Sequence, residues 1–125
     1  EWFRRAAEKG VLDAKVNLGE LHQFGLGVGK DEVKAIGFFK EAAEAGSPIG
    51  AEKLALLLSA TANASLKNPL EAAYWANRAA GAGRSEASAL ADRLRGELTP
   101  GEKTELERRL AGDEAPEPPV AGKAP

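Results

Sequence analysis

The fold is decided by residues 14–46, AKVNLGELHQFGLGVGKDEVKAIGFFKEAAEAG. Small and apolar residues recur there at steps of three and four positions, once before and once after a glycine-rich run. The first set is Ala14, Leu18, Leu21 and Gly25, and the second is Ala35, Phe38, Phe39, Ala42 and Ala43. The stretch therefore predicts two amphipathic helices joined by a turn, a helical hairpin.

The glycine-rich run FGLGVGKD (24–31) resembles a phosphate-binding loop, but it fails both known patterns. A P-loop needs a hydroxyl residue after the lysine, where Asp31 follows Lys30, and a dinucleotide loop needs a glycine in place of Lys30. Both motifs also follow a strand, whereas a helical pattern precedes this run. We predict instead that Gly25 and Gly27 turn the chain, that Val28 tucks into the hairpin and that Asp31 caps the second helix.

The hairpin pattern recurs along the chain. Three stretches share an aromatic residue, paired alanines and a final glycine: WFRRAAEKG (2–10), FFKEAAEAG (38–46) and WANRAAGAG (75–83). Their final glycines, Gly10, Gly46 and Gly83, are 36 and 37 residues apart, an interval typical of helical repeat arrays. Because one hairpin cannot cover its own apolar face, neighbouring units must stack on each other.

Start and stop signals give the expected helix boundaries. A capping side chain directly precedes a proline at Ser47-Pro48, Asn68-Pro69 and Thr99-Pro100. Thr99 and Glu102 also form a capping-box pattern, and the glycines at 46 and 83 suit helix C-termini. The predicted helices span about residues 2–9, 12–24, 32–45, 48–63, 69–82, 85–96 and 100–111.

Together these residues resemble the Sel1-like repeat, a relative of the tetratricopeptide repeat. The closest unit carries Ala14, Leu18, Gly19, Leu21, Gly25, Gly27, Val28, Asp31, Lys34, Ala35, Phe38, Phe39, Ala42, Ala43 and Gly46. The next unit matches more loosely through Ala51, Ala55 and Leu58, with Leu56 placed where the first unit has Gly19. His22 departs from the usual aromatic residue, and TANASLK (61–67) departs from the glycine-rich turn.

The resemblance implies an all-α solenoid whose first helices line a concave surface. We divide it into a partial unit 1–10, a full unit 11–46, a looser unit 47–83 and a partial unit 84–97, followed by a capping helix 98–111. The stretch 112–125 is rich in proline and alanine and predicts a disordered tail, in which Pro116 and Pro119 form one generic PxxP pattern. The chain starts inside a helical pattern and contains no methionine, so we expect a C-terminal fragment of a longer array with Trp2 and Phe3 only partly covered.

Composition argues against several classes of partner. The chain has 17 basic and 19 acidic residues without a basic block, so we expect no nucleic acid as partner. No apolar run reaches the length of about 18 residues that a membrane-spanning helix needs, so we expect no membrane insertion. Aromatic residues at helical spacing are expected in the core, although Tyr74 lies outside the repeated core position and could be exposed. Cysteine is absent, which leaves the compartment open between bacterial cytoplasm and periplasm.

The residues do not favour an enzyme or a cofactor. His22 is the single histidine, whereas most zinc sites take at least two histidines or a cysteine. We expect His22 to pack as a structural ring with one nitrogen hydrogen-bonded. The carboxylates of Glu20, Glu41 and Glu44 are expected on helix exteriors, in water.

Candidate partner-binding residues follow from the solenoid geometry. Asn17, Glu20 and Gln23 lie beside the inward face of their helix, where the family has its concave groove. We assign Leu54, Leu57 and Ala60 as their equivalents one unit on, with Arg93 beyond, although Leu54 and Leu57 also suit a buried core. The candidate groove is thus Asn17, Glu20, Gln23, Leu57 and Arg93.

A groove that changes from polar to apolar suits a peptide or a helix. The first hypothesis is therefore a non-catalytic scaffold or adaptor, with bacterial signalling as one setting, that binds a peptide or helix of a partner protein. The alternative is a bacterial cell-envelope component whose array binds a glycan or a lipoprotein. An enzyme is the third and least supported reading, because no catalytic set of residues comes together.

Overall fold

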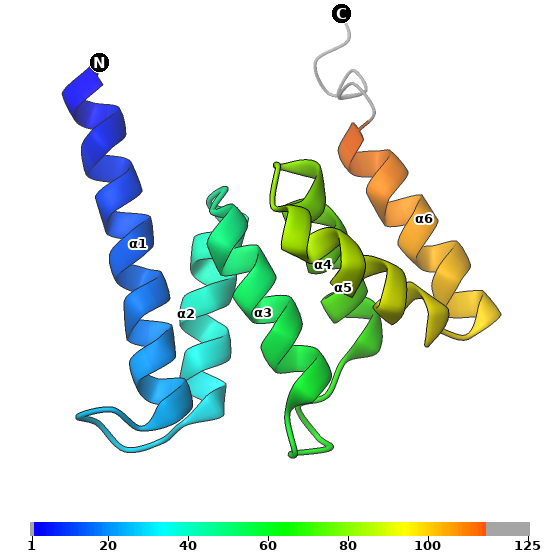
Figure 1. Ribbon diagram of the computed structural model, residues 1–125, viewed down its shortest axis with the longest axis horizontal. Coiled ribbons are helices and arrows are strands. Elements are labelled where there is room, and N and C mark those ends of the chain that lie inside the picture. Colours follow the sequence, from blue (N-terminus) through cyan, green and yellow to red (C-terminus); the bar gives the residue numbers. More distant parts are fainter. Residues whose placement is uncertain (1, 115–125) are drawn as a thin grey trace, which may run out of the picture.

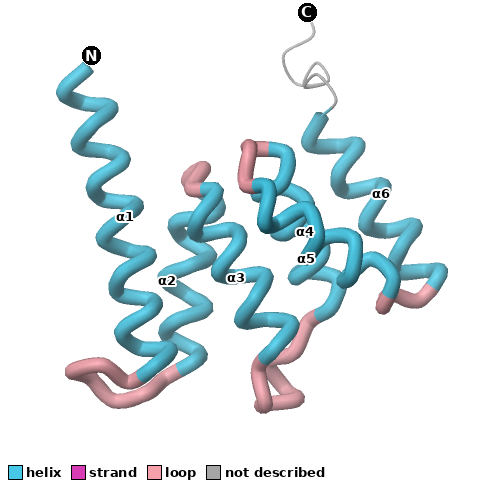
Figure 2. Tube along the Cα trace, in the orientation of Figure 1, coloured by secondary structure: helices cyan, strands magenta, loops and turns pink. Residues whose placement is uncertain are grey.

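The computed structural model describes the backbone of residues 2–114 and the side chains of residues 8–112. Its elements are six helices: α1 (Trp2–Phe24), α2 (Glu32–Glu44), α3 (Pro48–Ala60), α4 (Pro69–Gly81), α5 (Ser85–Gly96) and α6 (Pro100–Glu114). They stand side by side from α1 at one end to α6 at the other (Figure 1), and short turns join them (Figure 2). The predicted all-α solenoid is confirmed.

The first helix differs from the prediction, because α1 continues without a break from Trp2 to Phe24. The predicted break was at Gly10, and the equivalent break after Gly46, between α2 and α3, does form. There Ser47 accepts a hydrogen bond from the amide of Gly50, and Pro48 has no amide hydrogen. A proline also disfavours helical backbone in the residue before it. Val11 and Leu12, which follow Gly10, neither cap nor interrupt a helix, so the two predicted helices join.

The glycine-rich run forms the predicted turn between α1 and α2. Gly25 and Gly27 take left-handed backbone conformations, with φ of 68° and 79°. The amide of Asp31 donates to the carbonyl of His22 at 2.8 Å, and its side chain accepts from the amide of Lys34 at 3.1 Å. Val28 does not tuck into the hairpin but is exposed, so backbone hydrogen bonds hold the turn without its side chain.

The core depends on a close approach between α1 and α2. A Cβ atom added to Gly19 would lie 2.5 Å from the ring of Phe39, which is itself fully buried. By the 36-residue spacing between Gly10 and Gly46, the equivalent of Gly19 in α3 is Ala55, which is also fully buried. The predicted equivalence with Leu56 is therefore wrong by one residue, and Leu56 is 45% exposed.

The second hairpin, α3 and α4, holds most of the remaining core, including Leu54, Trp75 and Ala79. Its turn lacks the glycines of the first hairpin, but the amide of Asn68 donates to the carbonyl of Leu58 at 3.2 Å, as the amide of Asp31 does to His22. The Thr61 hydroxyl donates to the carboxylate of Glu32 at 2.9 Å, and the amide of Asn63 donates back to the Thr61 oxygen. The divergent stretch 61–67 thus keeps the backbone closure of the hairpin and adds a side-chain contact to α2.

The capping helix is present and packs mainly on α4. The predicted capping box is confirmed: the Thr99 amide donates to Glu102, and the Glu102 amide donates to the Thr99 hydroxyl. Leu106 is fully buried and provides the apolar anchor of the helix. The helix continues to Glu114, three residues beyond its predicted end at 111; the remaining tail, with Pro116 and Pro119, and the side chains of Trp2 and Phe3 lie outside the described residues.

Candidate partner-binding surface

The structure changes which residues share a surface with Asn17, Glu20 and Gln23. The 36-residue spacing assigns them to Lys53, Leu56 and Ser59 of α3, none of which is buried. The predicted residues Leu54, Leu57 and Ala60 are each one position further on. Since one residue turns a helix by about 100°, that step moves the side chain to another face.

Leu57 is consequently removed from the candidate groove. It is 2% exposed and belongs to the core of α3, so a partner cannot reach it. Arg93 remains exposed on α5, and the second spacing of 37 residues places it in line with Leu56. The first-helix row is hereafter the set Asn17, Glu20, Gln23, Lys53, Leu56, Ser59 and Arg93.

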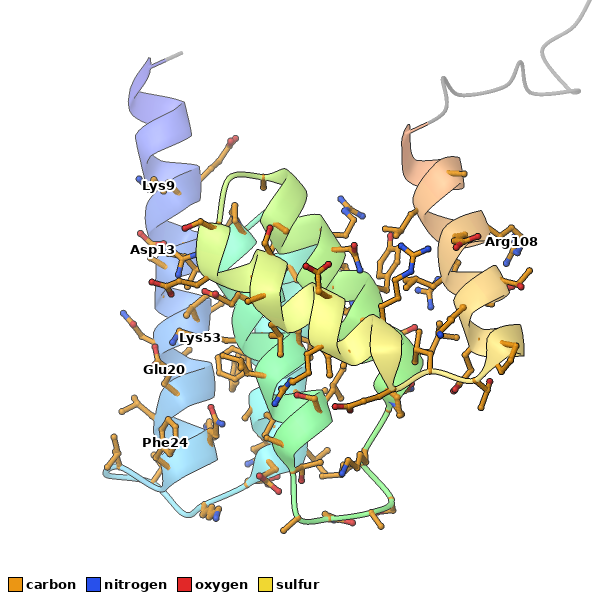
Figure 3. The ribbon with its side chains drawn as sticks, turned by 45° about the vertical axis from the view of Figure 1, so that its right-hand side comes forward. Lys9, Asp13, Glu20, Phe24, Lys53 and Arg108 are labelled. Atoms are coloured by element: carbon orange, nitrogen blue, oxygen red, sulfur yellow. The ribbon has the colours of Figure 1, made fainter. Side chains whose placement is uncertain are left out.

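An ion pair links the row across two repeat units. The Nζ atom of Lys53 lies 3.5 Å from a carboxylate oxygen of Glu20, with both side chains about one-third exposed. Figure 3 shows the two side chains between α1 and α3. An exposed pair of this kind contributes only about 0.2–1 kcal/mol to stability, so it mainly fixes charges on the surface.

Two exposed apolar residues, Phe24 and Leu56, lie on the same side of the ion pair. Phe24 is one helical turn beyond Glu20 on α1, and Leu56 is nearly one turn beyond Lys53 on α3. Because α1 and α3 run in the same direction (Figure 1), Phe24 and Leu56 extend from the ion pair toward the same end. Phe24 is 59% exposed, so its ring is available for contact with a partner.

A cavity of about 350 Å³ lies at the other end. It is bounded on α1 by Glu8, Lys9, Leu12 and Asp13 and on the α2–α3 side by the turn Gly46–Ile49. Lys9 and Asp13 follow the same face of α1 that carries Glu20 and Phe24 (Figure 3). The space exists because α1 packs mainly on α2 and makes few contacts with α3.

His22 has a structural position. Its ring stacks on Phe38 with 5.5 Å between the ring centroids and an angle of 8° between the planes. Its Nδ1 atom is buried and makes no hydrogen bond within the described residues. Among the residues that the structure describes, histidine, aspartate and glutamate form no group of three that could hold a metal ion.

One buried ionic contact was not predicted. Glu52 of α3 is buried, and its carboxylate accepts two hydrogen bonds from Arg84, which precedes α5, at 2.6 and 3.1 Å. The hydrogen bond to Glu52 and the charge of that carboxylate raise the pKa of Arg84 above its ordinary value. Arg84 lies 37 residues after Ser47, so an ion pair stands where the preceding unit has a capping serine.

Aromatic and charged residues attach α6 to α4. Arg109 of α6 lies 4.2 Å from the ring centroid of Tyr74 and 2.8 Å from the carboxylate of Glu71, which also accepts from Trp75. These contacts bury Tyr74, which the sequence did not place in the core. The cavity of about 310 Å³ beside them lies where α6 packs on the repeat array.

This geometry defines the chain as an α-solenoid of short helical hairpins with a capping helix. The Sel1 repeat family model matches residues 1–11, 12–47 and 53–83, more than half of the chain, and the protein belongs to the Sel1 repeat family. This agrees with the resemblance seen in the sequence.

A solved structure shares the fold. It is the crystal structure of c5321, described as a protective antigen present in uropathogenic Escherichia coli strains displaying an SLR fold. The two are 27% identical with a TM-score of 0.66, and the match covers 90% of the present chain but 25% of c5321. No protein with a curated description matches the chain. Within the described residues, every helix is too short or too polar to cross a membrane.

Proposed function

We propose that this Sel1 repeat chain is a non-catalytic interaction module that holds a peptide or helix of a partner protein along its first-helix row. A role in protein interaction is typical of the Sel1 repeat fold. The observation that carries the more specific proposal is the exposed pair Phe24 and Leu56 beside the Glu20–Lys53 ion pair. Apolar side chains next to fixed charges suit the two faces of an amphipathic helix.

A pair of matched variants tests the proposal. Leu56→Asp places a charge within the row, whereas Val33→Asp places the same charge on an exposed apolar position of α2, outside it. We expect affinity capture with the unaltered chain and with Val33→Asp to recover the same polypeptide and Leu56→Asp to lose it. Equal recovery by both variants would show that binding does not use the row.

A second candidate is an envelope component that binds a glycan or a lipoprotein. The description of the structural relative c5321 as a protective antigen favours this setting for the family. Tyr74 and Trp75 are buried, so Phe24 is the exposed ring on this surface on which a sugar could stack. Saturable binding of purified cell-wall glycan, retained by Leu56→Asp, would support the second candidate over the first.

A further inference from the structure

A second cavity lies beside Gly37, away from the first-helix row. Its volume is about 310 Å³, and its lining consists of His22, Lys34, Gly37, Phe38 and Glu41. The stacked rings of His22 and Phe38 are both half-buried and form one wall. Gly37 is exposed, and a Cβ atom added to it would meet no other atom within 4 Å. The cavity therefore combines an aromatic wall with open space over a glycine.

The equivalent position in the second hairpin is filled by an aromatic ring. Asp31 and Asn68 are the N-caps of α2 and α4 and are 37 residues apart, so the same spacing makes Tyr74 the equivalent of Gly37. Tyr74 is 7% exposed, and its ring makes an edge-to-face contact with Trp75 at 5.0 Å between the ring centroids. In α4 the chain itself thus provides the ring for which α2 leaves space.

Charged residues cover the Tyr74 ring, and one of them has the opposite sign in the first hairpin. Arg109 of α6 lies 4.2 Å from the Tyr74 ring centroid and donates to the carboxylate of Glu71 at 2.8 Å. The equivalent of Glu71 in α2 is Lys34, which is exposed and has no ion-pair partner within the described residues. An acidic group would complement Lys34 as Arg109 complements Glu71.

We propose that the cavity beside Gly37 is a docking site for an aromatic side chain of a partner protein that stands next to an acidic residue. The ring packs against the two stacked rings, and the carboxylate pairs with Lys34. Glu41, the acid of the cavity, already pairs with Lys15 at 3.2 Å, so Lys34 is the charge that selects the ligand. The inference is independent of what binds the first-helix row.

Two small probes with the same ring and opposite charges test the site. Para-hydroxyphenylacetate carries the phenol ring of tyrosine and a carboxylate, whereas tyramine carries that ring and an ammonium group. His22 is the single histidine, so its imidazole NMR signals report directly on the wall of the cavity. We expect para-hydroxyphenylacetate to shift these signals saturably and tyramine to bind about fivefold more weakly, since one exposed charge contact contributes little. No saturable shift, or equal affinities, would overturn the proposal.

Three variants locate the binding. Gly37→Tyr supplies a ring from the chain itself and should abolish binding of para-hydroxyphenylacetate. Gly81→Tyr is the matched control, because Gly81 also lies in a helix with open space around it, and it should leave binding unchanged. Lys34→Glu should reverse the preference, so that tyramine binds more tightly. Binding retained by Gly37→Tyr, or an unchanged preference in Lys34→Glu, would overturn the site.

Discussion

Single residues set how closely the helices approach. Gly19 is required because Phe39 occupies the space that any side chain would need. Gly19→Ala should destabilise the fold by about 1–3 kcal/mol, the usual cost of overpacking a core. Gly37→Ala, on an open face of α2, should instead stabilise it by about 0.5–1 kcal/mol. Urea unfolding of the two variants measures both, and equal effects would contradict the packing described for Gly19.

The surface pair Glu105–Arg108 on α6 gives a pH-dependent prediction. Its hydrogen bond from Arg108 lowers the pKa of Glu105 below the ordinary value. The contribution of a lowered carboxyl pKa to stability is present above the ordinary glutamate pKa of about 4.3 and is lost as pH falls through the lowered value.

Arg108→Gln should therefore raise the pKa of Glu105. Carbon NMR during a pH titration measures this pKa. The stability difference between this variant and the unaltered chain should be present at neutral pH and disappear in acid. A Glu105 pKa that is unchanged by the substitution would show that Arg108 does not act on it.

Individual elements differ in how far the sequence determined them. The helices that begin with a capping residue and a proline, α3, α4 and α6, start where predicted. The break predicted at Gly10 failed because a glycine alone does not end a helix when neither a cap nor a proline follows it. The burial of Tyr74 also escaped prediction, since it depends on Arg109, which is distant in sequence and closes over the ring only in the folded chain.

The capping helix depends on one anchor. Leu106 is fully buried against the array, whereas Leu110, one turn later, is only partly covered. Leu106→Ala should destabilise the protein by about 2–5 kcal/mol and Leu110→Ala by clearly less. Denaturant unfolding gives both values, and hydrogen exchange should show the larger loss of protection in α6. Equal costs for the two substitutions would contradict the anchoring by Leu106.

At the scale of the whole molecule, the two ends of the array differ. Exposed large apolar residues concentrate on α1 and the turn after it, with Val33 on α2 and Ile49 and Leu56 on α3, and the described surfaces of α5 and α6 have none. One end therefore remains open to contacts while α6 closes the other. This asymmetry agrees with the proposal that a partner binds at the first hairpins.

The repeat itself could be predicted from the sequence, but the candidate surface could be predicted only in part. Asn17 and Arg93 are exposed and Glu20 and Gln23 are half-buried, because polar residues beside an apolar helical stripe lie toward water. The error at Leu57 arose from counting 37 residues between units where the chain has 36. On a helix that single residue separates the buried Leu57 from the exposed Leu56. The surface residues of α3 could therefore be identified only after the structure showed which residues of the two units are equivalent.

A partner protein that binds along the first-helix row should touch the side chain at position 56. The most direct measurement is site-specific cross-linking in cells, with a photoreactive phenylalanine analogue placed at position 56 or, as control, at position 33. Binding along the row predicts a discrete polypeptide adduct from position 56 that is absent from position 33. No adduct from position 56, or the same adduct from both positions, would contradict it.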